Sequence, residues 1–379
     1  MTFVATRALT RFRCLAADCE DNCCHGWRVV IDRKHHDLLR ARLPAAEADA
    51  AMQLVGGEEP QRHALAVLDE RGRCSFEDAG RLCSIQSRFG EELLPDGCAT
   101  FPRVIGRIGP RFELTGSISC PEVARQALLA PDGHVFEEVP RALFGRGLVV
   151  QRSRQAPEGD AYEQSFGPVR ALFLKLLSLD AYPLRSRLFF IAVFSHHMRD
   201  RLRRGGEGVP ADEMAALTAA AELGPAMDAL EKDLDDAEVS TVLAMSVVQA
   251  ILRRPGMPDA MRRLVDGELD AVHRAHLDRP APVELDTYLA RYAVDNLLRD
   301  WFIKTPRLIA WVIGWLARIA TVRFLALAGE GPLEERLVRA VYVISRHFEH
   351  DRPLSESLID TMEAQGHLSI EAALSLIKL

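Results

Sequence analysis

The cysteines of this chain are confined to one end of it. All eight lie within the first 120 of 379 residues: Cys14, Cys19, Cys23, Cys24, Cys74, Cys83, Cys98 and Cys120. Thiols gathered in this way bind a metal ion, hold an iron–sulfur cluster or form a disulfide framework. The N-terminus has no apolar segment of the kind found in signal peptides, so we expect a cytoplasmic protein. In that reducing compartment a metal centre is favoured over disulfides.

The spacing of the cysteines leaves the identity of the metal open. Cys19 and Cys23 have the spacing of one zinc knuckle, but no second knuckle follows. An iron–sulfur cluster takes four thiolates at irregular spacings, and eight cysteines are enough for one cluster or two. Iron–sulfur is slightly preferred, and zinc stays the alternative.

The pattern beyond the cysteines predicts a mainly α protein. We expect a cysteine-rich metal or iron–sulfur domain with a few short strands over residues 1–130, a linker over 131–165 and an all-helical bundle over 166–379. Short strands are predicted at 28–32, 64–68 and 113–119, and helices at 32–43 and 121–129. The predicted C-terminal helices span 166–181, 184–204, 211–233, 236–253, 258–277, 283–303, 306–328, 332–349, 354–364 and 369–378.

Charge and hydropathy argue against two classes of partner. The net charge is −7, whereas nucleic-acid-binding proteins usually carry a basic surface. The most apolar stretch, Leu308–Ala328, is interrupted by Arg318 and Arg323. A membrane span needs about 20 predominantly apolar residues, so this stretch is interpreted as a buried helix. We therefore expect neither a nucleic acid nor a membrane as partner.

Several motifs recur in the order of a known family. They are Cys14-x4-Cys19-x3-Cys23-Cys24-His25-Gly26-Trp27, then Arg73-Cys74-x-Phe76, Leu82-Cys83-x-Ile85-Gln86, Gly90-Glu91-Glu92-Leu93-Leu94-Pro95 with Cys98, Phe101-Pro102-Arg103, and Ser119-Cys120-Pro121-Glu122. This set, over residues 12–125, resembles the flagellin lysine-N-methylase (FliB-like) family and, more distantly, the YkgJ-type cysteine-cluster proteins. In the C-terminal half, Tyr288-x2-Arg291-Tyr292-x3-Asn296 resembles a helix of the same family.

The resemblance implies a specific activity and specific cofactors. It implies methyl transfer from S-adenosylmethionine (SAM) to lysine side chains of a protein such as flagellin, or to a related small amine. It also implies a [4Fe–4S] cluster, one or two per chain, with the eight cysteines as metal ligands. The sequence shows no glycine-rich SAM-binding turn after a strand, so we hypothesise that the cluster helps to hold SAM.

Methylation of lysine requires a neutral amine, although free lysine has a pKa near 10.4. A base or a desolvating channel must therefore be supplied. The candidate catalytic residues are Tyr288, Tyr292 and Asp300. The candidate cofactor-binding residues are Trp27, Arg103, Asn296 and Arg299. The competing interpretation of the C-terminal residues among them is a buried hydrogen-bonded set between helices.

Two other functions remain open from the sequence. One is an iron–sulfur redox protein that does not methylate, and the other is a zinc-stabilised helical scaffold. The adjacent His35 and His36 look like a metal-binding pair. Neighbours on a helix point about 100° apart, so both are interpreted as ordinary helix residues.

Overall fold

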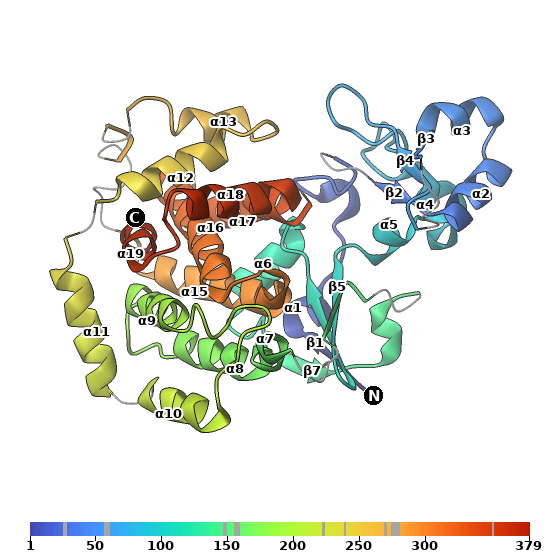
Figure 1. Ribbon diagram of the computed structural model, residues 1–379. Helices are drawn as coiled ribbons and strands as arrows, with labels where there is room; N and C mark the ends of the chain where they lie inside the picture. Colours follow the sequence, from blue (N-terminus) through green and yellow to red (C-terminus); the bar gives the residue numbers. More distant parts are fainter. Residues whose placement is uncertain are drawn as a thin grey trace. The chain divides into compact units, whose positions relative to one another are not determined.

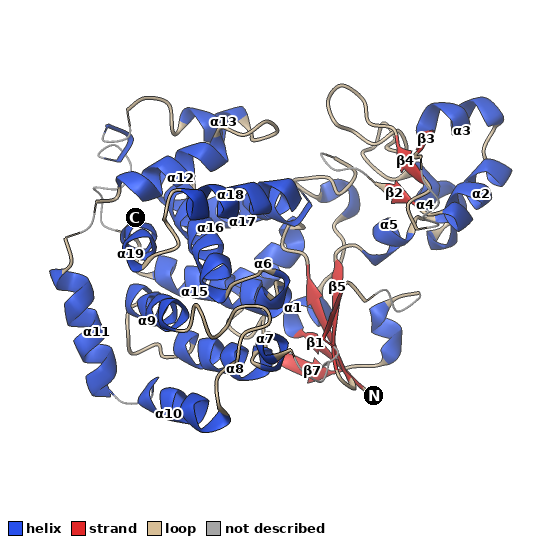
Figure 2. Cartoon of the chain, viewed as in Figure 1, coloured by secondary structure: helices blue, strands red, loops and turns tan. Residues whose placement is uncertain are grey.

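A computed structural model describes residues 1–25, 29–56, 61–146, 150–154, 160–221, 224–238, 240–268, 271–273, 281–350 and 352–379. The chain divides into two compact units (Figure 1). The first contains residues 1–126 and 135–153, and the second contains residues 127–134 and 154–379. Strands are confined to the first unit and its border, and the second is built from helices (Figure 2).

The first unit contains a five-stranded sheet of order β7-β1-β6-β5-β8. Its strands are β1 (Thr2–Thr6), β5 (Arg103–Ile108), β6 (Arg111–Gly116), β7 (Phe136–Glu138) and β8 (Arg152–Arg154). β5 and β6 form an antiparallel hairpin, whereas β1 runs parallel to β6 with Thr2 opposite Arg111. Helices α1 (Arg7–Arg11) and α6 (Pro121–Leu129) approach the end of β6 closely. A side chain at Gly116 would collide with Leu9 and Val123.

A smaller sheet of order β2-β4-β3 belongs to the same unit. Its strands are β2 (Val30–Ile31), β3 (Met52–Leu54) and β4 (Ala64–Ala66), and all the pairings are antiparallel. The accompanying helices are α2 (Arg33–Arg42), α3 (Ala45–Ala51), α4 (Ser84–Phe89) and α5 (Asp96–Thr100), with the short 3-10 helices η1 (Ala16–Asp18) and η2 (Glu91–Leu93). The Asp32 carboxylate accepts from the backbone N–H of His35 and so starts α2, as the sequence predicts.

The hydrophobic core of this smaller region includes cysteines. Ile31, Leu39 and Ala64, from β2, α2 and β4, are fully buried in it. Cys74 is buried in the same core, and Cys24, Cys83 and Cys98 pack against it. The three-stranded sheet and its helices therefore supply the apolar surroundings of half of the cysteines.

The second unit is a bundle of helices. They are α7 (Ala161–Gln164), α8 (Phe166–Leu177), α9 (Leu184–His197), α10 (Ala211–Ala221), α11 (Gly224–Asp236), α12 (Val242–Leu252), α13 (Asp259–Arg263), α15 (Glu284–Arg299), α16 (Leu308–Ala328), α17 (Leu333–His350), α18 (Arg352–Ala364) and α19 (Ile370–Lys378). The described residues also form the 3-10 helix η4 (Phe302–Lys304) in this unit and η3 (Arg141–Phe144) in the first unit.

Helix α16 is the central helix of this bundle (Figure 1). It packs against α9, α12, α15, α17, α18 and α19. Among the described residues, α16 is long and apolar enough to cross a membrane, but 89% of its most apolar window is buried inside the fold. Leu308–Ala328 is thus a core helix, as its interrupting arginines indicate.

The structure refines the predicted elements. The segment 131–165, predicted as a linker, contributes β7 and β8 to the large sheet, because β7 pairs with the N-terminal β1. That pairing joins residues far apart in sequence and leaves no local pattern. The helix predicted at 211–233 is two helices, α10 and α11, and α15 ends at Arg299 rather than at residue 303. Part of the predicted helix 258–277 lies outside the described residues.

Candidate functional site

The eight cysteines all lie in described parts of the chain, and no disulfide bond joins any of them. Cys74 and Cys120 are buried and Cys14 and Cys23 are exposed, with the others in between. Their neighbours divide them into two groups, defined below as the five-cysteine group and the three-cysteine group.

The five-cysteine group comprises Cys23, Cys24, Cys74, Cys83 and Cys98. These residues come from four separate segments: the loop before β2, the turn after β4, the start of α4, and α5. The backbone fixes their approach, because the N–H of Cys74 donates to the carbonyl of Cys24 at 2.9 Å. A bridge between Glu77 and Cys83 holds the start of α4 against the turn that carries Cys74.

Hydrogen bonding gives two thiols of this group opposite proton affinities. The Cys24 thiol donates to Cys83, which lowers the pKa of Cys83 to about 6 despite its burial. The backbone N–H groups of Ile85 and Gln86, at the start of α4, also favour the thiolate of Cys83. The pKa of Cys24 is correspondingly raised by its hydrogen bonds with Cys23 and Cys83. Cys83 is therefore the thiolate of this group near neutral pH.

Burial keeps two further members, Cys74 and Cys98, protonated. Desolvation raises the pKa of Cys98, and the neighbouring Cys83, Cys74 and Cys23 add to the rise. Desolvation also raises the pKa of Cys74, with Cys83 contributing. Thiols crowded in an apolar site resist ionisation together, whereas a bound cation would favour the thiolates. The donor set thus fits a cationic metal centre.

The three-cysteine group comprises Cys14, Cys19 and Cys120. Cys120 directly precedes α6, and burial raises its pKa to about 12, with Cys19 and Cys14 adding to the rise. Burial likewise raises the pKa of Cys19. Arg125 of α6 pairs with Glu20 and with Glu122, which ties the loop that carries Cys19 to the helix that follows Cys120.

Two predicted cofactor-binding residues belong to the first unit. Arg103 on β5 donates through Nε to the backbone carbonyl of Leu143 at 3.1 Å. That contact fixes its side chain within the unit. Trp27 lies outside the described residues.

A second candidate site is a buried ionic network in the helical unit. Arg299, at the end of α15, is 1% exposed and forms ion pairs with Asp300 at 3.1 Å and with Glu349 at 2.6 Å. Its guanidinium also donates to Asn296 Oδ1 at 3.1 Å. Arg318 from α16 reaches the same Asp300 carboxylate at 2.7 Å. Three helices therefore contribute to one enclosed set of charges.

Burial controls the protonation of two further members of this network. Desolvation raises the pKa of Asp295 to about 7, although the nearby Arg299 opposes the rise. Tyr292 is fully buried, and desolvation raises its pKa as well. The Tyr292 hydroxyl consequently keeps its proton at neutral pH, whereas the Asp295 carboxyl titrates near pH 7. Asp300 is more exposed, with 22% of its side chain accessible.

The structure brings together four of the five residues singled out in the C-terminal half. Tyr292, Asn296, Arg299 and Asp300 belong to the network, whereas Tyr288 does not. The Tyr288 hydroxyl donates to Glu334 at 3.2 Å in exposed surroundings, and Arg291 lies over its ring. Helical spacing alone places Tyr288 and Tyr292 on one face, but only Tyr292 reaches the core.

Sequence reasoning missed three members of the network: Asp295, Arg318 and Glu349. Asp295 and Arg299 have the i, i+4 spacing of a helical ion pair, which is a usable signal. Arg318 interrupts an apolar helix, and a buried charge of that kind requires a partner. Glu349 carries no local signal, because its pairing with Arg299 depends on the packing of α17 against the bundle.

Comparisons with known proteins agree with this architecture. The profile described as "FliB lysine N-methylase C-terminal domain" matches residues 170–376, which form most of the helical unit. The flagellar biosynthetic protein FliU of Salmonella muenchen is 26% identical over 147 residues, which are 38% of this chain and 86% of FliU. No solved structure matches the chain.

Two further relatives carry an enzyme name. The lysine-N-methylases of Salmonella typhimurium and Salmonella choleraesuis are each 27% identical over 133 residues, or 34% of this chain. Each match covers 33% of the length of the named relative.

The fold and the sites define a two-unit protein that joins a cysteine-rich unit to a helical bundle. Because the family profile spans more than half of the sequence, the chain belongs to the FliB lysine N-methylase family, as its motifs predict.

Proposed function

We propose that this protein is a SAM-dependent N-methyltransferase that acts on lysine side chains and carries an iron–sulfur cluster. Membership of the FliB family, carried by the match over 170–376, is the observation on which the proposal rests. The relatives named lysine-N-methylase support the same activity.

The five-cysteine group is the proposed place of the cluster. A [4Fe–4S] cluster takes four thiolates, and four of the five thiols of this group, those of Cys24, Cys74, Cys83 and Cys98, lie in or against one apolar core. When bound, the cluster would supply a redox-active and Lewis-acidic centre. The three-cysteine group has one thiol fewer than a cluster requires, so its cysteines are proposed as ligands of a second metal centre. Zinc is the alternative to iron for the cysteines.

The ionic network is proposed to serve the amine. Asp300 is held by two arginines, and its partly exposed carboxylate is the member suited to meet a lysine ammonium. Arg299 and Asn296 are enclosed and would act as positioning residues for Asp300. Asp295, with its pKa near 7, is suited to accept the proton that the ammonium must lose. Tyr292 would serve as a hydrogen-bond donor rather than as a base.

The proposed substrate is a lysine-bearing protein. The names of the relatives point to a flagellar protein such as flagellin. A related small amine is the alternative substrate class. We further propose a cytoplasmic location, where thiols are kept reduced.

Methyl transfer can be tested with anaerobically purified full-length protein and isotopically labelled SAM. Flagellin, an unrelated lysine-rich protein and small amines would be offered in parallel, and the products analysed by mass spectrometry. Label on lysine Nζ of flagellin alone supports the proposal in full. Label on small amines alone would show that the substrate is a small amine and not a protein. An intact cluster without any transfer, under conditions where SAM binds, would favour a redox protein instead.

A further inference from the structure

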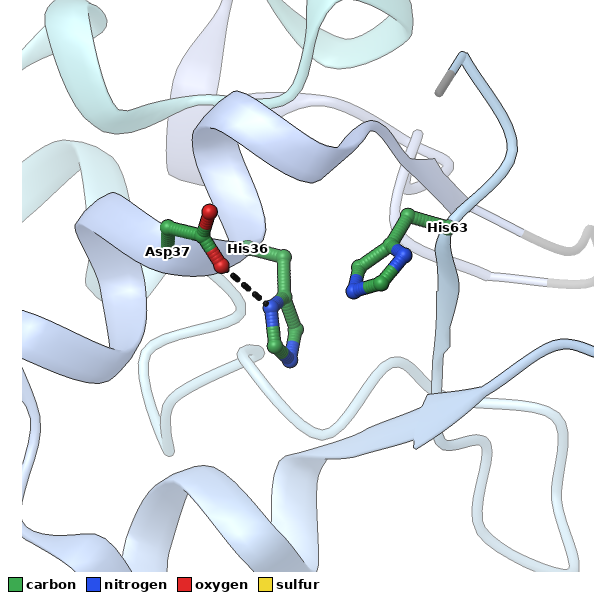
Figure 3. A group of neighbouring side chains, drawn as sticks. All are labelled: His36, Asp37 and His63. Atoms are coloured by element: carbon green, nitrogen blue, oxygen red, sulfur yellow. Dashed lines mark hydrogen bonds and ion pairs between the residues drawn. The ribbon is translucent and has the colours of Figure 1, made fainter. Parts of the chain in front are cut away.

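Two histidines and an aspartate outside the cysteine groups form a compact set of ligand atoms. His36 and Asp37 belong to α2, and His63 directly precedes β4 (Figure 3). One ligand atom from each of the three lies within 4.8 Å of the others. The rings of His36 and His63 meet edge to face, with centroids 4.7 Å apart. We propose that His36, Asp37 and His63 bind a divalent transition-metal ion, with Zn²⁺ as the best fit.

The backbone holds these residues together, although they are far apart in the sequence. The N–H of His63 donates to the carbonyl of Ile31 at 3.1 Å, and the carbonyl of His63 accepts from Val55 at 3.0 Å. His36 lies near the start of α2, the helix that follows Ile31, and its N–H donates to the carbonyl of Asp32 at 2.9 Å. Pairing of β2 with β4 therefore sets the position of one imidazole against the other. Ligands that are held by a helix and a strand in this way are positioned well enough to bind a metal ion.

The side chains have the chemistry and freedom that a metal site requires. Two imidazoles and a carboxylate are donors that suit Zn²⁺, and three protein ligands leave a fourth position open. Nδ1 of His36 lies 3.1 Å from Oδ1 of Asp37, and the Asp37 side chain is 68% exposed. Asp37 can therefore turn toward an ion without disturbing the core, while the buried His36 stays in place.

A neighbouring set with similar spacing differs, because an arginine side chain already pairs with its ligand atoms. Asp32, His35 and Asp96 also lie within metal-binding reach of one another. There, however, Nδ1 of His35 pairs with Asp32 at 2.5 Å, and the guanidinium of Arg146 lies 3.1 Å from Nε2 of His35. Arg146 also lies 3.5 Å from Asp96 and donates to the carbonyls of Glu91 and Leu94. A side-chain cation thus already serves that set, whereas the described contacts of the His36 and His63 rings are with each other and with Asp37.

The site can be tested by titrating the full-length protein with Co²⁺ alone. Cobalt bound by thiolates shows intense sulfur-to-metal charge-transfer absorption, whereas cobalt bound by imidazole and carboxylate does not. The proposal predicts one equivalent of Co²⁺ without the charge-transfer band, in addition to any bound by cysteines. That equivalent is lost in His63→Gln and in His36→Gln, and its affinity falls at least tenfold in Asp37→Ala.

His197→Gln, at an exposed histidine on α9, is the matched control and should leave the titration unchanged. Asp37→Ala keeps the test decisive if a histidine variant fails to fold, because the Asp37 side chain is 68% exposed. The proposal is overturned if every bound equivalent shows the thiolate band. It is also overturned if the Asp37 and His63 variants bind Co²⁺ as tightly as the His197 control.

Discussion

Arg299 on α15 and Glu349 on α17 form an ion pair of 2.6 Å in which the side chains are only 1% and 8% exposed. The same guanidinium meets Asp300, and Asp295 approaches its Nε at 3.7 Å. Desolvation makes such an arrangement costly unless each charge keeps its partner. The network therefore depends on Arg299 more than on any other of its members.

Replacing Arg299 by alanine should destabilise the protein by about 3–5 kcal/mol, because buried carboxylates lose their counter-charge. Chemical unfolding followed by circular dichroism measures the change. Arg307→Ala is the matched control, since Arg307 pairs with Glu363 at the same 2.6 Å but with side chains 50% and 42% exposed. That variant should cost less than about 1 kcal/mol. Equal losses in the two variants would contradict the energetic role of burial.

Asp295 should make stability depend on pH in a particular direction. Its pKa rises from 3.8 to about 7 on folding, so the folded state binds the proton more tightly than the unfolded state. The stability that comes from this tighter proton binding by Asp295 is fully present below pH 3.8 and is lost as the pH rises through about 7. Asp295→Asn should remove this dependence and raise stability above pH 7, by up to about 4 kcal/mol. If Asp295→Asn leaves the slope of unfolding free energy against pH the same as in the wild type between about pH 4 and 7, Asp295 is ionised in the folded protein over that range.

The two tyrosines of α15 should differ in their effect on methyl transfer. Tyr292→Phe removes a hydroxyl from the network beside Asn296 and Arg299, and a loss of at least about tenfold in turnover is expected on the proposed mechanism. Tyr288→Phe removes only a contact with Glu334 and should stay near the wild-type rate. Rates compared at matched folded fractions test this contrast. Equal losses would place Tyr288 in the machinery after all.

Cys83 should be much more reactive toward alkylating reagents than Cys120 in metal-free protein. Its pKa of about 6 makes it largely thiolate at pH 7, whereas burial keeps Cys120, with a pKa of about 12, protonated. Limited alkylation at pH 7 followed by peptide mapping should label Cys83 well before Cys120. Cys24→Ala removes the hydrogen bond to Cys83 and should slow the labelling of Cys83. Faster labelling of Cys120 would refute the assignment of the thiolate.

Local signals in the sequence predict much of the fold. The Asp32 cap, the α6 helix after Cys120 and the core helix over 308–328 are all confirmed. Each depends on neighbouring residues: a capping side chain, a proline at the first helical position, or continuous apolar spacing. The parallel pairing of β1 with β6 could not be predicted, because it joins residues more than 100 positions apart.

The candidate sites also combine features that the local sequence predicts with features that depend on the packing of distant segments. The cysteine region follows from residue identity, but the separation into groups of five and three requires the fold. The sequence predicts that His36 is an ordinary helix residue, because its neighbour His35 points elsewhere on the helix. The structure supports that separation, since His35 pairs with Asp32, yet it brings His63 to His36 from another element. A pairing of that kind cannot be read from the spacing of His35 and His36.

The central claim is that the five-cysteine group holds an iron–sulfur cluster, and metal analysis of anaerobically purified protein tests it most directly. The account predicts about four iron and four sulfide per chain for the wild type, with visible cluster absorption. Both should be lost in the double variant Cys83→Ser/Cys98→Ser and kept in Cys14→Ser, whose thiol belongs to the three-cysteine group. Zinc without iron in the wild type, or equal loss of iron in the Cys14 variant, would contradict it.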